Sequence, residues 1–399
     1  MSQIAVPRVA IAGLGGFAGN HHTVIKSLEE QGYCKLICTC DPNLNAQQDQ
    51  IQKFDLIERQ VRLHQDFNAM LDVEADNIDV VLLPTPIPLH ADQHRKVIEL
   101  GKACYLEKPP TLWWPEFQQM LEVEAKAKWQ TQIGFNFVGD PFRRRLKERL
   151  LSGEFGQVQG ATLFAIWPRD LEYYQRNNWA GKMEVDGKPV MDSPIGNACA
   201  HFVQDLLFWC GSGVMDSVAR VETVRANLQK AHPIESFDTV FLQAGLENNR
   251  WLRIAVTHTG LDEHQDREVI HCTRAKITLH SWWQASVEFT DGRMEWFESD
   301  LRGGLGPLGS NVRGYLEYVN GQRTRPGTAL SECTSFVALH NLAFLSSAEV
   351  EQIQESRLTR DAGKFGVTGL EAQLSLFIAT GKWPGRTPNK VSDEDLGKV

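Results

Sequence analysis

The segment VAIAGLGGFA, residues 9–18, decides the fold of the first part of the chain. Its first four residues are apolar and predict a strand, and its last six fit the pattern GxGxxA and are followed by helical spacing over about His21 to Gln31. Gly13 permits a tight turn, Gly15 lets a diphosphate approach the backbone, and Ala18 allows the helix to pack closely on the strand. Unpaired N–H groups at the start of the helix favour an anion there. The segment therefore predicts a dinucleotide site, to which we assign Gly13, Gly15, Gly16, Phe17 and Ala18.

A carboxylate follows the second predicted strand, Lys35 to Cys40. Asp41 stands 26 residues after Gly15, a position from which it can accept hydrogen bonds from ribose hydroxyls and repel a 2′-phosphate. Since Pro42-Asn43-Leu44 comes next, with no Arg or Lys close behind, the sequence favours NAD over NADP as the cofactor. The alternative left open is an α/β domain without a nucleotide, in which the glycines form a tight turn and Asp41 caps it.

Strands and helices alternate through the first 130 residues. Further strands are predicted at Ile78–Leu83 and Ala103–Leu106, with a helix over about His90–Leu100 between them. Such alternation makes a parallel, doubly wound sheet with helices on both faces, and its ligands lie at the carboxyl ends of the strands. The residues that follow these two strands are therefore assigned to the cofactor site: Pro84, Thr85, Pro86 and His90 after the first, and Glu107 and Lys108 after the second. Considered alone, Lys108 would be an ordinary surface lysine.

The pattern changes after about residue 155, where short strand-like runs recur. They are predicted at 161–166, 239–244, 251–258, 276–280, 285–289 and 293–297, and Thr290-Asp291-Gly292 joins the last two as a hairpin. Helices are expected at about 201–208 and 334–347, and the glycine-rich stretch 302–314 is expected to be a loop. We predict a nucleotide-binding domain over 1–130 and, over 131–399, an α+β domain with a large, mainly antiparallel open sheet.

Composition excludes several classes of protein. The chain has 399 residues, a net charge of −9 and an apolar fraction of 42%, which favours two ordinary globular domains. The acidic balance gives no reason to expect nucleic acid or an anionic membrane as a partner. No apolar run is long enough to span a membrane, and Met1 to Val9 does not have the pattern of an export signal. We therefore expect a cytoplasmic protein.

Two clusters of polar residues have plain structural interpretations. Among the eight cysteines, Cys34, Cys38 and Cys40 lie close together, but Cys38 and Cys40 alternate along a strand and no second ligand pair accompanies them. Buried free thiols are favoured over a metal site, and we assign no metal. The run Arg143-Arg144-Arg145, continued by Lys147, Glu148 and Arg149, is expected to form the solvated face of a helix.

Several of these motifs together resemble one family. The GxGxxA turn, Asp41, the strand that leads to Pro86 and His90, and above all Glu107-Lys108-Pro109 resemble the glucose–fructose oxidoreductase/inositol dehydrogenase/rhizopine-catabolism (Gfo/Idh/MocA) family. The resemblance continues through Gly134-Phe135-Asn136 and Gly153-Glu154-Phe155-Gly156 to a helix that carries Asn197 and His201, and it covers about residues 7–210. It implies a Rossmann domain followed by an α/β domain whose open sheet often packs against that of another subunit, here a homodimer or homotetramer.

The resemblance also implies an activity and roles for residues. Members are typically NAD(P)-dependent dehydrogenases of sugars, polyols and related hydroxy compounds. Lys108 matches the lysine that contacts the reacting hydroxyl, and His201 matches the histidine of an Asp-x-x-x-His pair. Position 197 departs from the pattern, because Asn197 stands where many members have aspartate, and an amide cannot act as a base. Residues assigned to the substrate are Lys108, Asn136, Tyr174, Arg176, Trp179, Asn197 and His201.

The chemistry expected is hydride transfer, with Lys108 and His201 as the catalytic residues. A neutral imidazole suits a general base because its pKa lies near the working pH, and an ammonium stabilises a developing alkoxide. Structural interpretations stay open: His201 as a core histidine, and Tyr174, Arg176 and Trp179 as an ordered loop. Two other functions also stay open, namely an enzyme that retains NAD and catalyses elimination, hydrolysis or epimerisation, and a ligand sensor without turnover.

Overall fold

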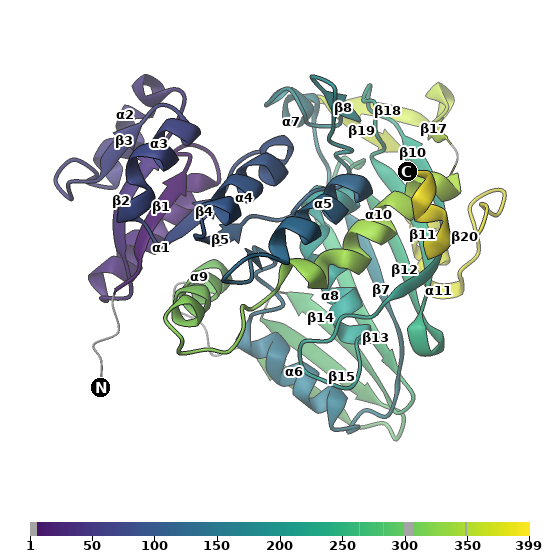
Figure 1. Cartoon of the computed structure of the whole chain (residues 1–399). Helices are drawn as coiled ribbons and strands as arrows, with labels where there is room; N and C mark the ends of the chain where they lie inside the picture. The colour runs from purple at the N-terminus through teal and green to yellow at the C-terminus, as the bar shows by residue number, and fades with distance from the viewer. Residues whose placement is uncertain (1–5, 263, 282, 299–305, 348) are drawn as a thin grey trace. The chain divides into compact units, whose positions relative to one another are not determined.

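The computed structural model describes residues 6–262, 264–281, 283–298, 306–347 and 349–399 (Figure 1). The chain forms two compact units. The first comprises Met1–Thr111, Glu116–Asp140 and Leu301–Cys333, and the second comprises Leu112–Pro115, Pro141–Asp300 and Thr334–Val399. The division at residue 130 stays a prediction about the extent of the nucleotide-binding domain. The compact units differ from it because a segment of the C-terminal third folds with the first unit.

The first unit is built on a parallel sheet of six strands, as predicted, in the order β3-β2-β1-β4-β5-β6. The strands are β1 (Arg8–Ala12), β2 (Lys35–Cys40), β3 (Arg62–His64), β4 (Val80–Leu83), β5 (Ala103–Leu106) and β6 (Gln132–Ile133). The helices of this unit are α1 (Ala18–Glu30), α2 (Gln48–Lys53), α3 (Phe67–Glu74), α4 (His90–Glu99) and α9 (Gly306–Val319), and α5 (Trp114–Glu124) begins in the second unit. Every residue of β4 and β5 is buried, as expected for central strands covered on both faces.

Helix α9 corrects the prediction of a loop over 302–314, of which residues 302–305 lie outside the described part. Its glycines at 306, 309 and 314 lower its intrinsic helix propensity. Its buried face carries Val312, Tyr315 and Leu316, which pack into the apolar core of the first unit together with residues of β1 and α1. Burial of this face stabilises the helix in spite of the glycines, and a composition-based prediction does not include that contribution.

The second unit is built on a mixed, mainly antiparallel sheet of ten strands, which confirms the predicted fold class. The main path runs β16-β15-β14-β13-β7-β12-β11-β10-β17, β20 pairs with β10, and only β7 with β12 and β10 with β17 pair in parallel. The strands are β7 (Val158–Ile166), β10 (Val221–Lys230), β11 (Thr239–Leu246), β12 (Arg250–Thr257), β13 (Gln265–Cys272), β14 (Ala275–Ser281), β15 (Gln284–Phe289), β16 (Met294–Glu298), β17 (Val350–Gln352) and β20 (Val391–Ser392). Two small hairpins, β8 (Glu184–Val185) with β9 (Lys188–Pro189) and β18 (Leu358–Asp361) with β19 (Lys364–Val367), lie outside this sheet.

Helices cover both faces of the large sheet. The helices of this unit are α6 (Pro141–Leu151), α7 (Leu171–Gln175), α8 (Ala200–Cys210), α10 (Thr334–Ser347) and α11 (Leu370–Thr380). Nearly all of α8 and most of α10 are buried. On the opposite face, Leu374 and Phe377 of α11 pack against Phe164 and Phe241 of the sheet. The predicted helices at 201–208 and 334–347 are confirmed.

Helix α6 corrects part of the prediction of a solvated face: Arg145 and Glu148 are exposed, but two of its charged residues are not. Arg143 and Lys147 are almost fully buried, with side chains no more than 1% exposed. The guanidinium Nε of Arg143 donates to Asp205 Oδ2 at 2.7 Å, and Lys147 Nζ donates to the carbonyl oxygens of Phe208 and Gly211. These partners lie more than sixty residues away on or just after α8, so the charge pattern of α6 alone could not indicate them.

The described cysteines are all free and buried, which confirms the prediction of buried thiols. Within the described ranges, no helix is both long enough and apolar enough to cross a membrane. The same part of the chain contains no group of three or more His, Cys, Asp or Glu side chains arranged to hold a metal ion.

Candidate functional site

The glycine turn lies between β1 and α1. Gly13 N donates to Cys40 O at 2.7 Å, and the φ angle of Gly13 is +104°, a conformation that a residue with a Cβ rarely adopts. A Cβ on Gly13 would lie only 3.3 Å from the Cβ of Ala18. The turn therefore requires glycine at 13 and a small residue at 18, as the sequence predicts.

Asp41 is fixed against this turn. Its Oδ2 accepts a hydrogen bond from Leu14 N at 3.0 Å, and its Oδ1 accepts one from Asn43 N at 2.9 Å. The carboxylate thus connects the end of β2 to the glycine turn and needs no side-chain partner to hold its position. The Asn43 contact is the cap that the alternative without a nucleotide required, so this bond by itself does not distinguish the two interpretations.

A cavity of about 540 Å³ lies beside the glycine turn and Asp41, within the first unit. It brings together residues that follow β1, β2 and β4, as expected at the carboxyl edge of a parallel sheet. Of the predicted cofactor residues, the cavity is lined by Gly13, Gly15, Ala18, Asp41, Pro84, Thr85 and Pro86. Gly16, Phe17, His90, Glu107 and Lys108 are not among its described lining residues. A cavity at this place fits a dinucleotide better than the alternative of a closed turn does.

The same cavity includes residues that sequence reasoning missed. They come from the segment after β3 and from α4, and they are Gln65, Asp66, Phe67, Asn68, Leu89, Asp92, Gln93 and Lys96. The basic Lys96, whose Nζ donates to Asn68 Oδ1, lies 55 residues beyond Asp41. The argument for NAD considered only the residues directly after Asp41, so it could not include this lysine.

His90 links the two strand-end loops. Its Nδ1 lies 2.8 Å from Pro109 O, and its Nε2 lies 2.7 Å from Thr85 O. Burial lowers the pKa of His90, while the two carbonyl oxygens act in the opposite direction. A neutral imidazole has one N–H and donates to one of the two carbonyls at a time. His90 therefore holds the loops together and does not line the cavity.

Glu107 is a buried carboxylate with two partners. Its Oε1 lies 2.9 Å from His21 Nε2, and its Oε2 accepts from Lys108 N at 3.2 Å. A Cβ on Gly134 would lie 2.7 Å from Oε1, so glycine at 134 makes room for this side chain. Lys108 itself is half-buried and directly follows this fixed carboxylate.

Two further polar groups of the first unit are held by neighbours. His22 Nε2 lies 3.0 Å from Gly13 O, and burial lowers the pKa of His22 to about 4, so the ring is neutral at pH 7. Asn136, assigned to the substrate, accepts at Oδ1 from Tyr105 Oη at 2.9 Å and from Asn311 Nδ2 at 2.7 Å. Asn311 belongs to α9, within the stretch expected to be a loop, which is why sequence reasoning missed it.

In the second unit, the residues assigned to the substrate around α7 form an ordered group. The guanidinium of Arg176 stacks 3.6 Å from the ring centroid of Tyr173 and lies 5.3 Å from that of Trp179. Tyr174 Oη lies 3.2 Å from His258 Nδ1, and burial raises the pKa of this tyrosine well above its usual value. The structure thus brings Arg176 and Trp179 together, while Tyr174 packs against a buried histidine.

Asn197 lies in a capped turn, and His201 follows it. Ser193 Oγ accepts from Gly196 N at 3.0 Å and begins the π-helical turn η4 (Pro194–Ala198), after which α8 carries His201. Asn197 Nδ2 donates to Asp192 Oδ1 at 3.0 Å. Sequence reasoning missed Asp192, because a single aspartate before a Ser-Pro turn forms no recognised motif.

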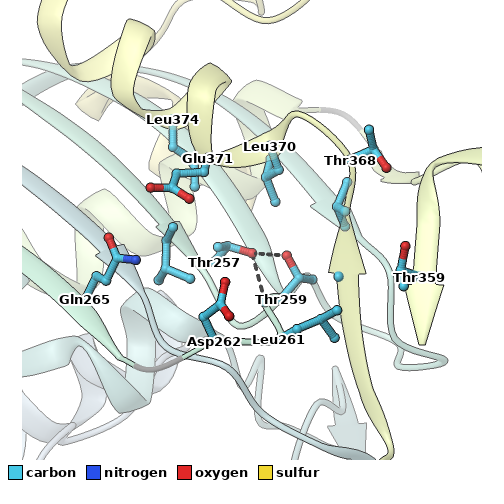
Figure 2. Close-up of a pocket in the computed structure, with 14 residues that line it drawn as sticks. Thr257, Thr259, Leu261, Asp262, Gln265, Thr359, Thr368, Leu370, Glu371 and Leu374 are labelled. Atoms are coloured by element: carbon cyan, nitrogen blue, oxygen red, sulfur yellow. Dashed lines mark hydrogen bonds between the residues drawn. The ribbon is translucent and has the colours of Figure 1, made fainter. Parts of the chain in front are cut away.

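A second cavity, of about 250 Å³, lies in the second unit between α11 and the loop after β12 (Figure 2). Figure 2 shows the carboxylates of Asp262 and Glu371 and the amide of Gln265 around it. Thr257 Oγ1 and Thr259 Oγ1 form a hydrogen bond of 2.8 Å at its base. None of the residues that the sequence assigns to a site lines this cavity.

Known sequences match this chain mainly over the first unit. Residues 7–135 match a family model, GFO_IDH_MocA, described as "Oxidoreductase family, NAD-binding Rossmann fold". Scyllo-inositol 2-dehydrogenase (NAD(+)) of Bacillus subtilis is 32% identical over 150 residues, which are 38% of this chain and 42% of that protein. Inositol 2-dehydrogenase of Rhizobium meliloti is 32% identical over 105 residues, 26% of this chain and 32% of that protein. The chain therefore matches less than half the length of either relative.

Solved structures share the whole fold. The WlbA dehydrogenase of Bordetella pertussis, in complex with NADH and UDP-GlcNAcA, has a TM-score of 0.67 at 22% identity, over 86% of this chain and 97% of that one. Levoglucosan dehydrogenase, in complex with NADH and L-sorbose, has a TM-score of 0.72 at 15% identity, over 87% and 99%. At these identities the likeness shows the fold, and it confirms the predicted combination of a Rossmann sheet with a large mixed sheet.

Proposed function

We propose that this chain, whose residues 7–135 belong to the Gfo/Idh/MocA oxidoreductase family and its NAD-binding Rossmann fold, is an NAD(H)-dependent dehydrogenase of a sugar, polyol or related hydroxy compound. The observation that carries the proposal is the cavity at the glycine turn, with the carboxylate of Asp41 fixed beside it. The dehydrogenases among its relatives give the substrate class.

Asp41 is the residue that selects the cofactor. Both of its oxygens already accept backbone N–H groups, so the carboxylate keeps its place and its charge when a ribose approaches. A fixed anion favours the 2′-hydroxyl of NAD over the 2′-phosphate of NADP. Lys96 brings one positive charge to the same cavity and opposes this preference, so NAD is favoured without excluding NADP.

Lys108 and His201 are the proposed catalytic residues. The nicotinamide, when bound, supplies the hydride acceptor or donor. His201 removes the proton of the reacting hydroxyl. The ammonium of Lys108 stabilises the negative charge that develops on the oxygen of this hydroxyl. Asn136, Tyr174, Arg176, Trp179 and Asn197 are proposed to bind the substrate's remaining hydroxyls.

The compartment and the oligomeric state are proposed on other grounds. The buried free cysteines fit a reducing compartment such as the cytoplasm. A homo-oligomer through the large sheet is proposed from the family resemblance.

One observation favours a second candidate function. Asn197 stands where many members of the family have aspartate, which suits a sensor that binds its ligand without turnover. An enzyme that retains NAD and catalyses elimination, hydrolysis or epimerisation would need the same cofactor site. Product formation without net NADH identifies that case.

A thermal-shift screen tests the proposal. NAD and NADP are each combined with a panel of polyols, sugars and sugar acids, and NADH formation is followed for every pair that raises the melting temperature. Ligand at about a hundred times its Kd adds roughly 2.7 kcal/mol of stability, so the screen detects binding whatever reaction follows it. Stabilisation by a sugar without any product would support the sensor instead.

The variant Lys108→Ala provides the largest expected effect on activity. Loss of the charge that stabilises the alkoxide lowers kcat by about 100-fold to 1000-fold, while the Kd for NAD stays within about threefold, because Lys108 is not among the residues that line the cavity. The matched control is Lys102→Ala, a half-exposed lysine before β5. Wild-type turnover in Lys108→Ala would remove this lysine from the mechanism.

A further inference from the structure

Asn197 has no carboxylate of its own, but the carboxylate of Asp192 lies beside it. Asp192 Oδ1 lies 3.0 Å from Asn197 Nδ2. A carboxylate only accepts hydrogen bonds, so the Asn197 side chain must present its NH₂ group to Asp192. The amide oxygen of Asn197 is thereby directed away from Asp192, and its orientation is fixed by chemistry.

Asp192 is itself held firmly. It is buried, its Oδ2 accepts from Gly181 N at 2.8 Å, and its own N donates to Lys182 O at 3.0 Å. The residue before it, Met191, has a φ angle of +51°, in the left-handed region that residues other than glycine rarely occupy. Such strain persists only where the surrounding structure enforces it, and it is concentrated at functional sites.

The charge of Asp192 reaches the residues proposed to bind the substrate. Tyr173 and Tyr174 on α7 are among the titratable groups on which it acts. Burial is the main cause of the raised pKa of both tyrosines; the negative charge of Asp192 is the next cause for Tyr173, and for Tyr174 it adds to the larger effect of Asp238. Asn197 stands in η4, four residues before His201 of α8.

We propose that Asp192 is a positioning residue, which orients the amide of Asn197 and supplies beside it the negative charge that many relatives carry at position 197 itself. The inference rests on the proposed dehydrogenase function, and it removes the observation that favoured a sensor.

A swap of the two side chains tests the proposal, with the wild type, Asp192→Asn, Asn197→Asp and the double variant compared. In Asp192→Asn, the new amide oxygen can still accept from Gly181 N–H, but its NH₂ group then faces the NH₂ of Asn197, so Asn197 must turn its amide over to regain a hydrogen bond and loses its wild-type orientation. In Asn197→Asp, two carboxylates face each other, and one must hold a proton. In the double variant, the amide at 192 accepts from Gly181 and donates to the carboxylate at 197, so both of these hydrogen bonds are restored.

The expected melting temperatures follow from these contacts. Both single variants melt several degrees below the wild type, Asn197→Asp more so at pH 8 than at pH 5.5, and the double variant recovers most of the loss. A double variant that melts no higher than the singles would overturn the pairing. These measurements need no substrate, so they remain informative if the wild type turns over nothing in the panel, an outcome that contradicts only the proposed function.

Kinetic measurements show whether Asp192 positions the catalytic groups or only stabilises the fold. Asp192→Asn is expected to lower kcat by about tenfold or more and to move the acidic limb of the kcat/KM profile down by about one pH unit, because the general base loses a nearby negative charge. The double variant should restore both. The control Glu74→Gln removes a buried carboxylate of the first unit, which accepts from Arg62 and Asn77, and should lower stability without moving the limb. Wild-type kcat and an unmoved limb in Asp192→Asn would overturn the positioning role.

Discussion

The two units bury their polar groups in different ways. At the carboxyl edge of the Rossmann sheet, Asp41 and His90 meet backbone groups of neighbouring loops, and Asp41 lines a cavity. Beneath the large sheet, Arg143, Asp205 and Glu268 lie in the core, where Arg143 pairs with Asp205. Polar groups satisfied by the backbone of strand-end loops leave room for a ligand, whereas charges that neutralise one another fill the space themselves. The strand-end loops of the first unit therefore indicate a binding site, whereas the buried charges of the second unit indicate a contribution to the stability of the fold.

The largest expected effect lies in the second arrangement. Arg143→Met removes the cation paired with Asp205 and leaves a buried carboxylate uncompensated, so the free energy of unfolding of the second unit should fall by about 3 to 5 kcal/mol. Urea denaturation followed by tryptophan fluorescence measures the change. NAD binding to the folded protein should be unaffected.

The neighbouring arginine supplies the matched control. Arg144 pairs with Asp216 at 2.7 Å, and both side chains are partly exposed. Arg144→Met should therefore cost less than about 1 kcal/mol. Equal losses in the two variants would contradict the distinction between a buried and a surface charge on α6.

The next largest effect is a dependence of the unfolding free energy on pH, which Glu268 causes. Burial, reinforced by the charge of Asp205, raises the pKa of Glu268 to about 8, and Trp209 Nε1 donates to its carboxylate. The folded state thus holds a proton that the unfolded state releases near pH 4.5, so this group's stabilisation is complete below that pH and is lost as the pH rises towards 8. Glu268→Gln should abolish a loss of about 2 kcal/mol between about pH 5 and pH 7.

The measurement compares the wild type with Glu268→Gln across this range. Buried histidines such as His22, with its pKa lowered to about 4, change stability in the opposite direction. They are common to both proteins and cancel in the difference. A difference in unfolding free energy that does not grow with pH would show that Glu268 is ionised in the folded protein.

The clearest effect on binding concerns the first unit. Asp41→Ala removes the carboxylate beside the cavity and should weaken NAD binding by about tenfold while narrowing the preference for NAD over NADP, since a charge-assisted hydrogen bond contributes about 1.5 kcal/mol. Calorimetric titration with each cofactor measures both changes.

Asp66→Ala is its control. Asp66 lines the same cavity and caps α3 by accepting from Ala69 N at 2.8 Å. Its loss should reduce stability by about 1 kcal/mol and leave the ratio of the two cofactor affinities unchanged. If the two variants change that ratio alike, cofactor selection depends on the total charge of the cavity and not on Asp41.

Local sequence was sufficient where a feature depends on neighbouring residues. The GxGxxA turn, the bounds of β2 and β5, and the carboxylate after β2 all follow from short-range rules of turn geometry and strand burial. The structure confirms them, together with the predicted class of both sheets. The roles of Lys108 and His201 stay predictions that only kinetics can test.

Local sequence failed where burial overrides composition. The glycines of α9 indicated a loop and the charges of α6 a solvated face, yet α9 is a helix with a buried apolar face and α6 buries Arg143 and Lys147. Lys96, Asn311 and Asp192 gave no signal, because their partners belong to other segments and no spacing rule connects them.

The sequence by itself thus determined the Rossmann sheet, its glycine turn and the match of residues 7–135 to an NAD-binding oxidoreductase family model. The tertiary structure alone decided which charged side chains are buried and which carboxylate accompanies Asn197. The physical reason is the range of the interactions. A turn or a strand is stabilised by residues a few positions apart, whereas a buried charge is stable only beside a partner that the fold brings from elsewhere in the chain.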